Sequence, residues 1–282
     1  ARKCGGRVLV MDESSGDGGL ASEGGLTNYW ECNISPATVF TPRELFEMLS
    51  LEGLRVQFHR VPITDEQAPQ EKDFDTVLGA MRAGYKQSPG FACVFNCALG
   101  RGRTTSGLVI ACVAWRSIVG DKYHGETWDV DAMKRLELDA GAKANLEWAE
   151  FDAVVKVCQH VRSGVDRKVF VDCVINQCSH MQNLRTDIYA MALQAQNAPS
   201  AKKREALLRR GEGYLERYIY LLLFNEYCCE VHDIRSSLYM AGHKAGSFKD
   251  WIEEQSQAGL QLYQLLDGLD LTNGGGSRWR LE

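Results

Sequence analysis

The organisation of this sequence is decided by one stretch, Val94-Phe95-Asn96-Cys97-Ala98-Leu99-Gly100-Arg101-Gly102-Arg103-Thr104-Thr105. The pattern predicts a short apolar strand over Phe91 to Phe95, then a glycine-containing loop, then a helix that continues through Ser106 to Val119. A cysteine opens the loop and an arginine closes it, with five residues between them. We interpret the loop as an anion-binding cradle that carries its own nucleophile.

The chemistry of such a cradle follows from its backbone. A loop that curls can point its N–H groups inward, and the helix behind it adds a positive N-terminal end. Gly100 and Gly102 permit the backbone angles that this needs. A thiol at the centre ionises more easily, so Cys97 is the predicted nucleophile, Arg103 the phosphate-binding fork and Thr104 a hydroxyl donor to the sulfur. The alternative is that the cysteine is simply a small buried side chain.

A second catalytic candidate is Asp65, on a loop between a predicted strand (Leu54 to Val61) and a predicted helix (about Gln70 to Tyr85). Cleavage of a phosphoester leaves an alkoxide, which departs readily only when a carboxylic acid protonates it. Loops of this kind converge on the cradle in α/β folds. Glu66 and Asp73 are weaker candidates, and the alternative for Asp65 is a turn residue.

Several motifs are similar to those of the paladin family, which is related to the phytase-like (inositol polyphosphate) phosphatases of the protein tyrosine phosphatase superfamily. The resembling stretches are Asn96 to Ala111, Phe58 to Pro69, Met181 to Arg185 and Tyr214 to Asn225, within a resemblance from about Leu54 to Leu266. The resemblance implies a phosphocysteine mechanism. It also implies that Thr64-Asp65 before Pro69 carries the general acid, although Gln67-Ala68 stands where relatives have a tryptophan.

The resemblance also implies a substrate with several phosphates. Arg101 resembles the basic loop residue of phosphoinositide phosphatases, which suits an inositol phosphate or a lipid head group. We therefore expect the loop residues to bind substrate, with His59 and Arg60 lining the same pocket from beside the acid loop. The expected substrate-binding residues are Ala98, Leu99, Gly100, Arg101, Gly102, His59 and Arg60.

The expected fold class is α/β: a mixed sheet of the protein tyrosine phosphatase type flanked by helices, with a helical C-terminal extension. We expect a flexible N-terminal segment over 1–31, with a short strand near Arg7 to Met11, and a phosphatase-like catalytic core over 32–165. A helical extension packed on that core is expected over 166–270, and a tail over 271–282. Thr41 with Glu44, and Ser247 with Asp250, predict capped helix starts.

Composition sets limits on location and partners. The chain has 282 residues and a net charge of −5, so bulk electrostatics does not favour nucleic acid as a partner. Its ten cysteines include no CxxC pair, which argues against zinc, and suit free thiols in the cytoplasm. We expect no metal, no cofactor and no transmembrane segment. The basic stretch from Lys202 to Arg210 leaves room for peripheral membrane contact, although a solvated helix face explains it as well.

Two further readings stay open. The chain could be a phosphate-binding scaffold that has lost turnover, or a protein tyrosine or dual-specificity phosphatase. A thiol oxidoreductase is disfavoured because no second cysteine lies at the required spacing, although Cys93 could form a protective disulfide with Cys97. The resemblance further implies tandem repeats in a parent protein, whose other repeats would then be partners.

Overall fold

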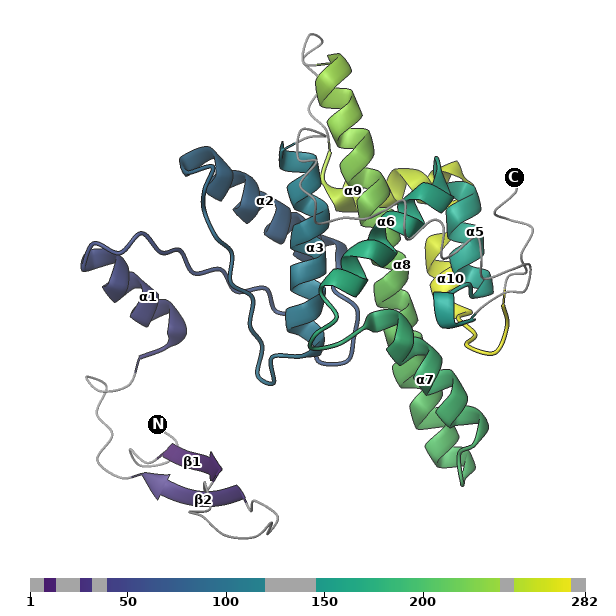
Figure 1. Cartoon of the computed structure of the whole chain (residues 1–282), viewed down its shortest axis with the longest axis horizontal. Helices are drawn as coiled ribbons and strands as arrows, with labels where there is room; N and C mark the ends of the chain where they lie inside the picture. The colour runs from purple at the N-terminus through teal and green to yellow at the C-terminus, as the bar shows by residue number, and fades with distance from the viewer. Residues whose placement is uncertain (1–7, 14–25, 32–39, 120–145, 239–245, 275–282) are drawn as a thin grey trace. The chain divides into compact units, whose positions relative to one another are not determined.

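The structure is a computed structural model that describes residues 8–13, 26–31, 40–119, 146–238 and 246–274. These residues belong to two compact units, 1–60 and 61–282, which are described separately (Figure 1). All the predicted catalytic residues lie in the second unit. Most of the predicted tail over 271–282 lies outside the described residues.

The N-terminal unit combines a two-stranded ladder with one helix. Strand β1 (Val8–Glu13) pairs antiparallel with β2 (Leu26–Glu31). Helix α1 (Pro42–Leu51) begins where the sequence predicts it, because Thr41 and Glu44 form a capping box. Their hydrogen bonds are 2.6 Å from the Thr41 N–H to the Glu44 carboxylate and 3.3 Å from the Glu44 N–H to the Thr41 hydroxyl.

The described part of the C-terminal unit consists of helices that pack around α8 (Ala201–Leu238). Helix α2 (Glu71–Gln87) follows the acid loop, and α3 (Gly102–Val119) follows the cradle. Further along the chain come η2 (Leu146–Trp148), α5 (Asp152–His160), α6 (Gly164–Gln177) and α7 (Leu184–Gln196). The unit ends with α8 (Ala201–Leu238), α9 (Phe248–Gln255), the π-helical turn η3 (Ser256–Leu260) and α10 (Leu262–Asp267).

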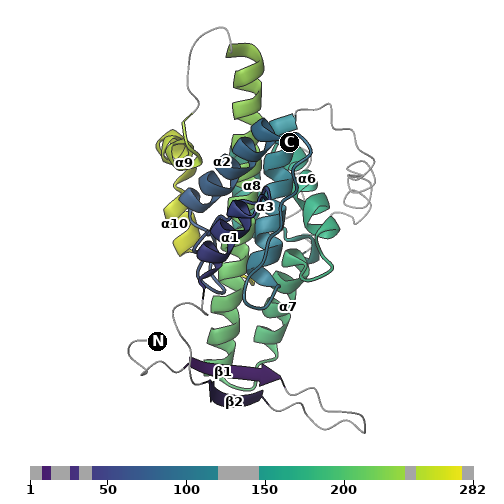
Figure 2. The same ribbon diagram turned by 90° about the vertical axis from the view of Figure 1, so that its left-hand side faces the viewer.

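Helix α8 is the axis of this unit. Helix α7 runs back along it as a helical hairpin, and α3 packs against it between α2 and α6 (Figures 1 and 2). The side chains of Leu221, Leu222 and Leu223 are all buried, so this part of α8 is covered on every side. An aromatic cluster joins α2, α8 and α9, with the Phe74 ring 5.0 Å from Phe224 and 5.2 Å from Phe248 between centroids.

The predicted α/β fold is wrong. Within the described residues the one ladder is the two-stranded pair β1 and β2, and neither Leu54 to Val61 nor Phe91 to Phe95 forms a strand. A strand needs a neighbouring backbone to pair with. These segments instead use their apolar side chains against helices: Phe58 stacks on Phe46 of α1 at 5.3 Å, and Phe91 contacts Trp115 of α3 at 5.7 Å.

The predicted helix starts agree with the structure, because the sequence signals for a helix start are local. The helix starts at Thr41 and Ser247 are confirmed, the latter by a capping box with Asp250. Helix α3 is largely buried, and it is covered by other helices and not by a sheet.

Candidate active site

The cradle loop runs from Cys97 into the first turn of α3. Gly100 takes a left-handed backbone angle, φ 67°, which glycine adopts without a steric penalty. The helix then begins at Gly102, and the Thr105 N–H donates to the Arg101 carbonyl at 2.8 Å. The loop therefore has the tight curvature that the sequence predicts, and it ends on a helix N-terminus.

The first residue of this loop, Cys97, carries a thiol that ionises more readily than an ordinary cysteine. Burial opposes its ionisation, but the Thr104 hydroxyl and the backbone N–H groups of Thr104, Leu99 and Arg101 favour the thiolate and outweigh it. Together they lower the pKa of Cys97 to about 7 from its ordinary value of 9.0. Nearby Cys93 behaves in the opposite way, because burial raises the pKa of its thiol. The loop thus stabilises a negative charge at one defined atom.

Arg103 and Asp65 come together although the chain separates them by the whole of α2. The Arg103 Nε lies 3.3 Å from the Asp65 Oδ1, with 27% of the arginine side chain and 67% of the aspartate side chain exposed. The predicted phosphate-binding arginine and the predicted acid are therefore neighbours. The Asp65 carboxylate therefore lies at the Nε side of the Arg103 guanidinium.

The loop that carries Asp65 is a turn with one unusual backbone angle. The Gln67 N–H donates to the Thr64 carbonyl at 3.4 Å, and Glu66 has a φ of 60°. A non-glycine residue rarely adopts that angle, so contacts elsewhere must hold it there. The Glu66 carboxylate pairs with Arg210 of α8 at 3.1 Å.

The third acid candidate has a structural partner. Asp73 is buried, and its Oδ2 accepts the Gln70 N–H at 2.9 Å at the start of α2. A capping aspartate of this kind is oriented toward its own helix end. Asp65 is thus the acid candidate that the structure brings to Arg103.

The predicted substrate-binding residues divide into two sets. Ala98, Leu99 and Arg101 are exposed on the rim of the cradle, while Gly100 and Gly102 are half-buried within it. His59 and Arg60 are exposed and end the N-terminal unit, and their role in substrate binding stays a prediction.

Residues of α8 that the sequence analysis did not assign to the site lie beside it. The guanidinium of Arg217 donates from Nη2 to the Gln67 carbonyl at 2.8 Å, and Gly213 packs closely on the Glu66 carbonyl. Gln182, before α7, lies against Gly102. The available signal was the charged pair Glu216-Arg217 within the otherwise apolar run from Tyr214 to Phe224, which the periodicity alone assigns to the core.

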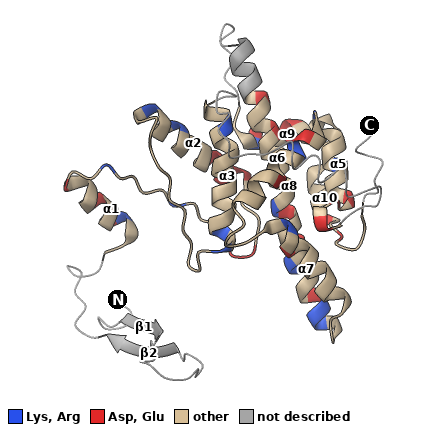
Figure 3. Cartoon of the chain, viewed as in Figure 1, with Lys and Arg blue, Asp and Glu red and all other residues tan. Residues whose placement is uncertain are grey.

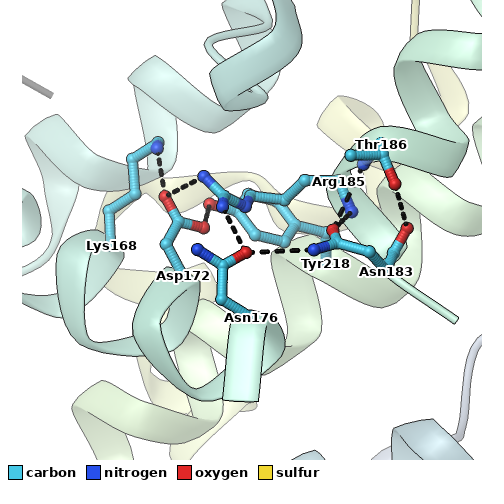
Figure 4. A network of polar contacts seen from close by, with 7 residues as sticks. All are labelled: Lys168, Asp172, Asn176, Asn183, Arg185, Thr186 and Tyr218. Atoms are coloured by element: carbon cyan, nitrogen blue, oxygen red, sulfur yellow. Dashed lines mark hydrogen bonds and ion pairs between the residues drawn. The ribbon is translucent and has the colours of Figure 1, made fainter. Parts of the chain in front are cut away.

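A buried polar network lies behind the site and joins α6, α7 and α8 (Figure 4). The Asp172 carboxylate accepts from Lys168 at 2.5 Å and from the Tyr218 hydroxyl at 2.6 Å, and it lies 3.4 Å from Arg185. Arg185 also donates to Asn176 at 2.6 Å. Because Lys168 and Asp172 are completely buried, the carboxylate faces its cationic partners inside the protein, and the network is a structural connection between the helices.

The basic stretch that the sequence singles out lies on the surface of the described chain. Lys202, Lys203 and Arg204 are exposed near the start of α8, where Figure 3 shows Lys and Arg gathered on the hairpin of α7 and α8. No group of three or more potential metal ligands occurs in the part of the chain that the structure describes. None of the described helices is long and apolar enough to cross a membrane.

Comparison with known proteins adds the evolutionary context. A family model of protein-tyrosine-phosphatase-like phytases, with the description "Inositol hexakisphosphate", matches residues 1–115. The chain is 34% identical to Paladin of Homo sapiens, over 82% of this chain and 26% of that protein. It is 32% identical to Paladin of Gallus gallus, over 81% of this chain and 25% of that protein. The chain thus spans about a quarter of the length of these relatives. No solved structure matches it.

Proposed function

Since this chain belongs to the paladin family, which is related to the phytase-like cysteine phosphatases, we propose that it is a phosphomonoesterase that works through a phosphocysteine intermediate. Its substrates are inositol phosphates or phosphoinositides. The observation that carries the proposal is the Cys97 thiol, whose pKa is lowered to about 7 by a hydroxyl and three backbone N–H groups. The same loop ends in Arg103, which pairs with Asp65 at 3.3 Å.

The first step forms a bond between sulfur and phosphorus. The Cys97 thiolate attacks the phosphoryl group in line with the ester oxygen, while Arg103 and the loop N–H groups bind the other phosphoryl oxygens. The bond from phosphorus to the ester oxygen breaks, and Asp65 gives that oxygen its proton. Substrate must therefore replace the Asp65 carboxylate at Arg103, which frees the acid to face the leaving group.

The second step hydrolyses the phosphocysteine. Water attacks phosphorus, Asp65 now accepts the water proton, and the electron pair of the bond from sulfur to phosphorus returns to Cys97. The Thr104 hydroxyl, which favours the thiolate form of Cys97, makes sulfur a better leaving group at this point. All four residues thus have a role that their chemistry suits.

The inositol preference rests on the family description and on the rim. The matched family is described by inositol hexakisphosphate. Arg101 is an exposed cation on the cradle rim, where it can meet a neighbouring phosphate of a polyphosphorylated ring.

A second candidate is a module that binds phosphate without turnover. The ion pair between Arg103 and Asp65 favours it, because a carboxylate that stays on the arginine cannot protonate a leaving group. In that case the cradle would still bind an anion, and only the chemistry would be missing.

The test is phosphate release from inositol hexakisphosphate without metal. We expect release by the wild type, none by Cys97→Ser, and a fall of about a hundredfold or more in Asp65→Asn, the usual range for loss of a general acid. Cys93→Ser is the matched control, because this cysteine lies just before the loop and should not affect release. Binding of inositol hexakisphosphate without release by the wild type would favour the binding module, and neither binding nor release would refute both.

A further inference from the structure

Arg217 of α8 lies in a position that core packing alone does not explain. Its side chain is only 2% exposed, although a guanidinium is charged at all physiological pH values. Burial lowers its pKa, while Tyr214, Asp65 and Glu66 raise it and Arg103 lowers it further. Arg217 is therefore an arginine buried within electrostatic range of both the acid loop and the cradle.

The nitrogen atoms of this guanidinium face in two directions. Nη2 donates to the Gln67 carbonyl at 2.8 Å. Nη1 lies 3.5 Å from the point that a Cβ on residue 102 would occupy, so it faces the first residue of α3. Nε and Nη1 are buried without a hydrogen-bond partner in the described structure, which is costly for charged N–H groups.

The same stretch of α8 contacts the acid loop at two more points. A Cβ added at Gly213 would lie 2.8 Å from the Glu66 carbonyl, and Arg210 pairs with the Glu66 side chain at 3.1 Å. Since Glu66 holds a left-handed backbone angle with φ at 60°, the loop is in a conformation that it would not keep unaided. Three contacts from one helix face therefore fix the residues that directly follow Asp65.

We propose that Arg217 is a positioning residue that holds the Asp65 loop against the cradle, and so sets where the general acid stands relative to Cys97. The inference deepens the proposed function and rests on it for its catalytic consequence. Arg217 acts through the Gln67 carbonyl and does not touch the reacting atoms. The hydrogen bond to Gln67 orients the guanidinium, and Nη1 faces the first residue of α3.

The first experiment does not depend on catalysis. Hydrogen–deuterium exchange is measured over residues 63–68 in the full chain as the wild type, Arg217→Met, Arg217→Lys and Arg209→Gln. Arg209 is the matched control, because it lies on the same helix, pairs with Glu205 at 2.7 Å and has no contact with the loop. We expect faster exchange in Arg217→Met, a smaller increase in Arg217→Lys, and no change in Arg209→Gln. Equal exchange in all four proteins, with folding verified by circular dichroism, would overturn the proposal.

The second experiment compares two leaving groups. p-Nitrophenyl phosphate has a leaving group that needs little protonation, whereas phenyl phosphate depends on the acid. We expect Arg217→Met to lower kcat for phenyl phosphate by about ten- to a hundredfold, the usual cost of a misplacement of about 1 Å. The rate for p-nitrophenyl phosphate should change by less than about threefold, the selective pattern also expected of Asp65→Asn.

The outcomes separate the two proposals. An equal fall for both substrates would mean that Arg217 is merely structural and would overturn the positioning role. If the wild type hydrolyses neither substrate nor inositol hexakisphosphate, the proposed function fails, and the exchange experiment alone still decides whether Arg217 fixes the loop.

Discussion

The ionisation of Cys97 provides the sharpest prediction, because it can be measured without any substrate. The change is in pH, and the readout is the rate of alkylation by iodoacetamide, resolved for each cysteine by peptide mass spectrometry. With a pKa of about 7, about half of the Cys97 side chains are thiolate at pH 7. A thiol at the ordinary value of 9.0 is only about 1% ionised there.

The rate advantage is smaller than this ratio, because a less basic thiolate is a weaker nucleophile. With a Brønsted slope of about 0.45, the difference of about two units between the two pKa values makes each Cys97 thiolate about eight times less reactive than an ordinary cysteine thiolate. The fiftyfold gain in thiolate therefore leaves Cys97 only about sixfold faster at pH 7. Above pH 10, where both are ionised, Cys97 should be about eightfold slower than an ordinary cysteine peptide. The order of reactivity thus inverts with pH.

Two internal comparisons make the measurement decisive. Cys93 should alkylate with a midpoint above 9.0, since burial raises the pKa of its thiol. Thr104→Val should raise the Cys97 midpoint by about one pH unit, which is the value of one charge-assisted hydrogen bond of about 1.5 kcal/mol. A Cys97 midpoint near 9.0, with no inversion, would show that the loop does not stabilise the thiolate and would refute the reasoning.

Three other perturbations test particular contacts. Asp172→Asn should lower the free energy of unfolding by about 3–5 kcal/mol in urea denaturation, because Lys168 and Arg185 lose the buried carboxylate that faces them; a loss under 1 kcal/mol would contradict this. Gly213→Ala should lower kcat for phenyl phosphate but leave p-nitrophenyl phosphate nearly unaffected, since the new Cβ would press on the Glu66 carbonyl; unchanged kcat for both would contradict it. Phe74→Ala should lower the free energy of unfolding by about 3–5 kcal/mol in the same assay, because its fully buried ring is part of the aromatic cluster. An unchanged denaturation midpoint would contradict this and would show that the cluster relaxes around the cavity.

The features that could be predicted from sequence are those whose causes are local. Capping boxes at Thr41 and Ser247 locate helix starts within a few residues, because the hydrogen bonds involved span only three positions. The cradle is local in the same way, since a loop of seven residues supplies the N–H groups that surround the Cys97 sulfur. Its role in catalysis stays a prediction.

The sequence could not reveal that the expected mixed sheet is missing from the described residues, because strand pairing is a non-local property. Alternation at Leu54 to Val61 shows only that every second side chain is apolar, and packing on a helix satisfies that as well as a ladder does. The short run before Cys97 is similar: Phe91 packs on Trp115, but Val94 is 91% exposed. In neither segment does periodicity reveal whether a backbone partner exists.

The contacts of α8 with the acid loop could not be predicted either, because they join residues far apart in the sequence. Arg217 and Tyr218 are adjacent in an apolar run, and only the folded chain shows that they project about 100° apart around the helix. Arg217 reaches the Gln67 carbonyl, whereas the Tyr218 hydroxyl donates to Asp172 at 2.6 Å within the buried network. One helix therefore supports the acid loop on one side and joins its neighbours on the other.

The separate roles of Arg217 and Tyr218 can be tested by comparing Tyr218→Phe, which removes the hydrogen bond to Asp172, with Arg217→Met, which removes the hydrogen bond to Gln67. The change removes one buried hydrogen bond to a carboxylate, so the free energy of unfolding should fall by about 1.5–3 kcal/mol in urea denaturation. The ratio of kcat for p-nitrophenyl phosphate to kcat for phenyl phosphate should stay at the wild-type value, because the contacts at Glu66 and Gln67 are intact. If Tyr218→Phe shifted that ratio as far as Arg217→Met does, stability of α8 as a whole, and not the Arg217 contact, would be what positions Asp65.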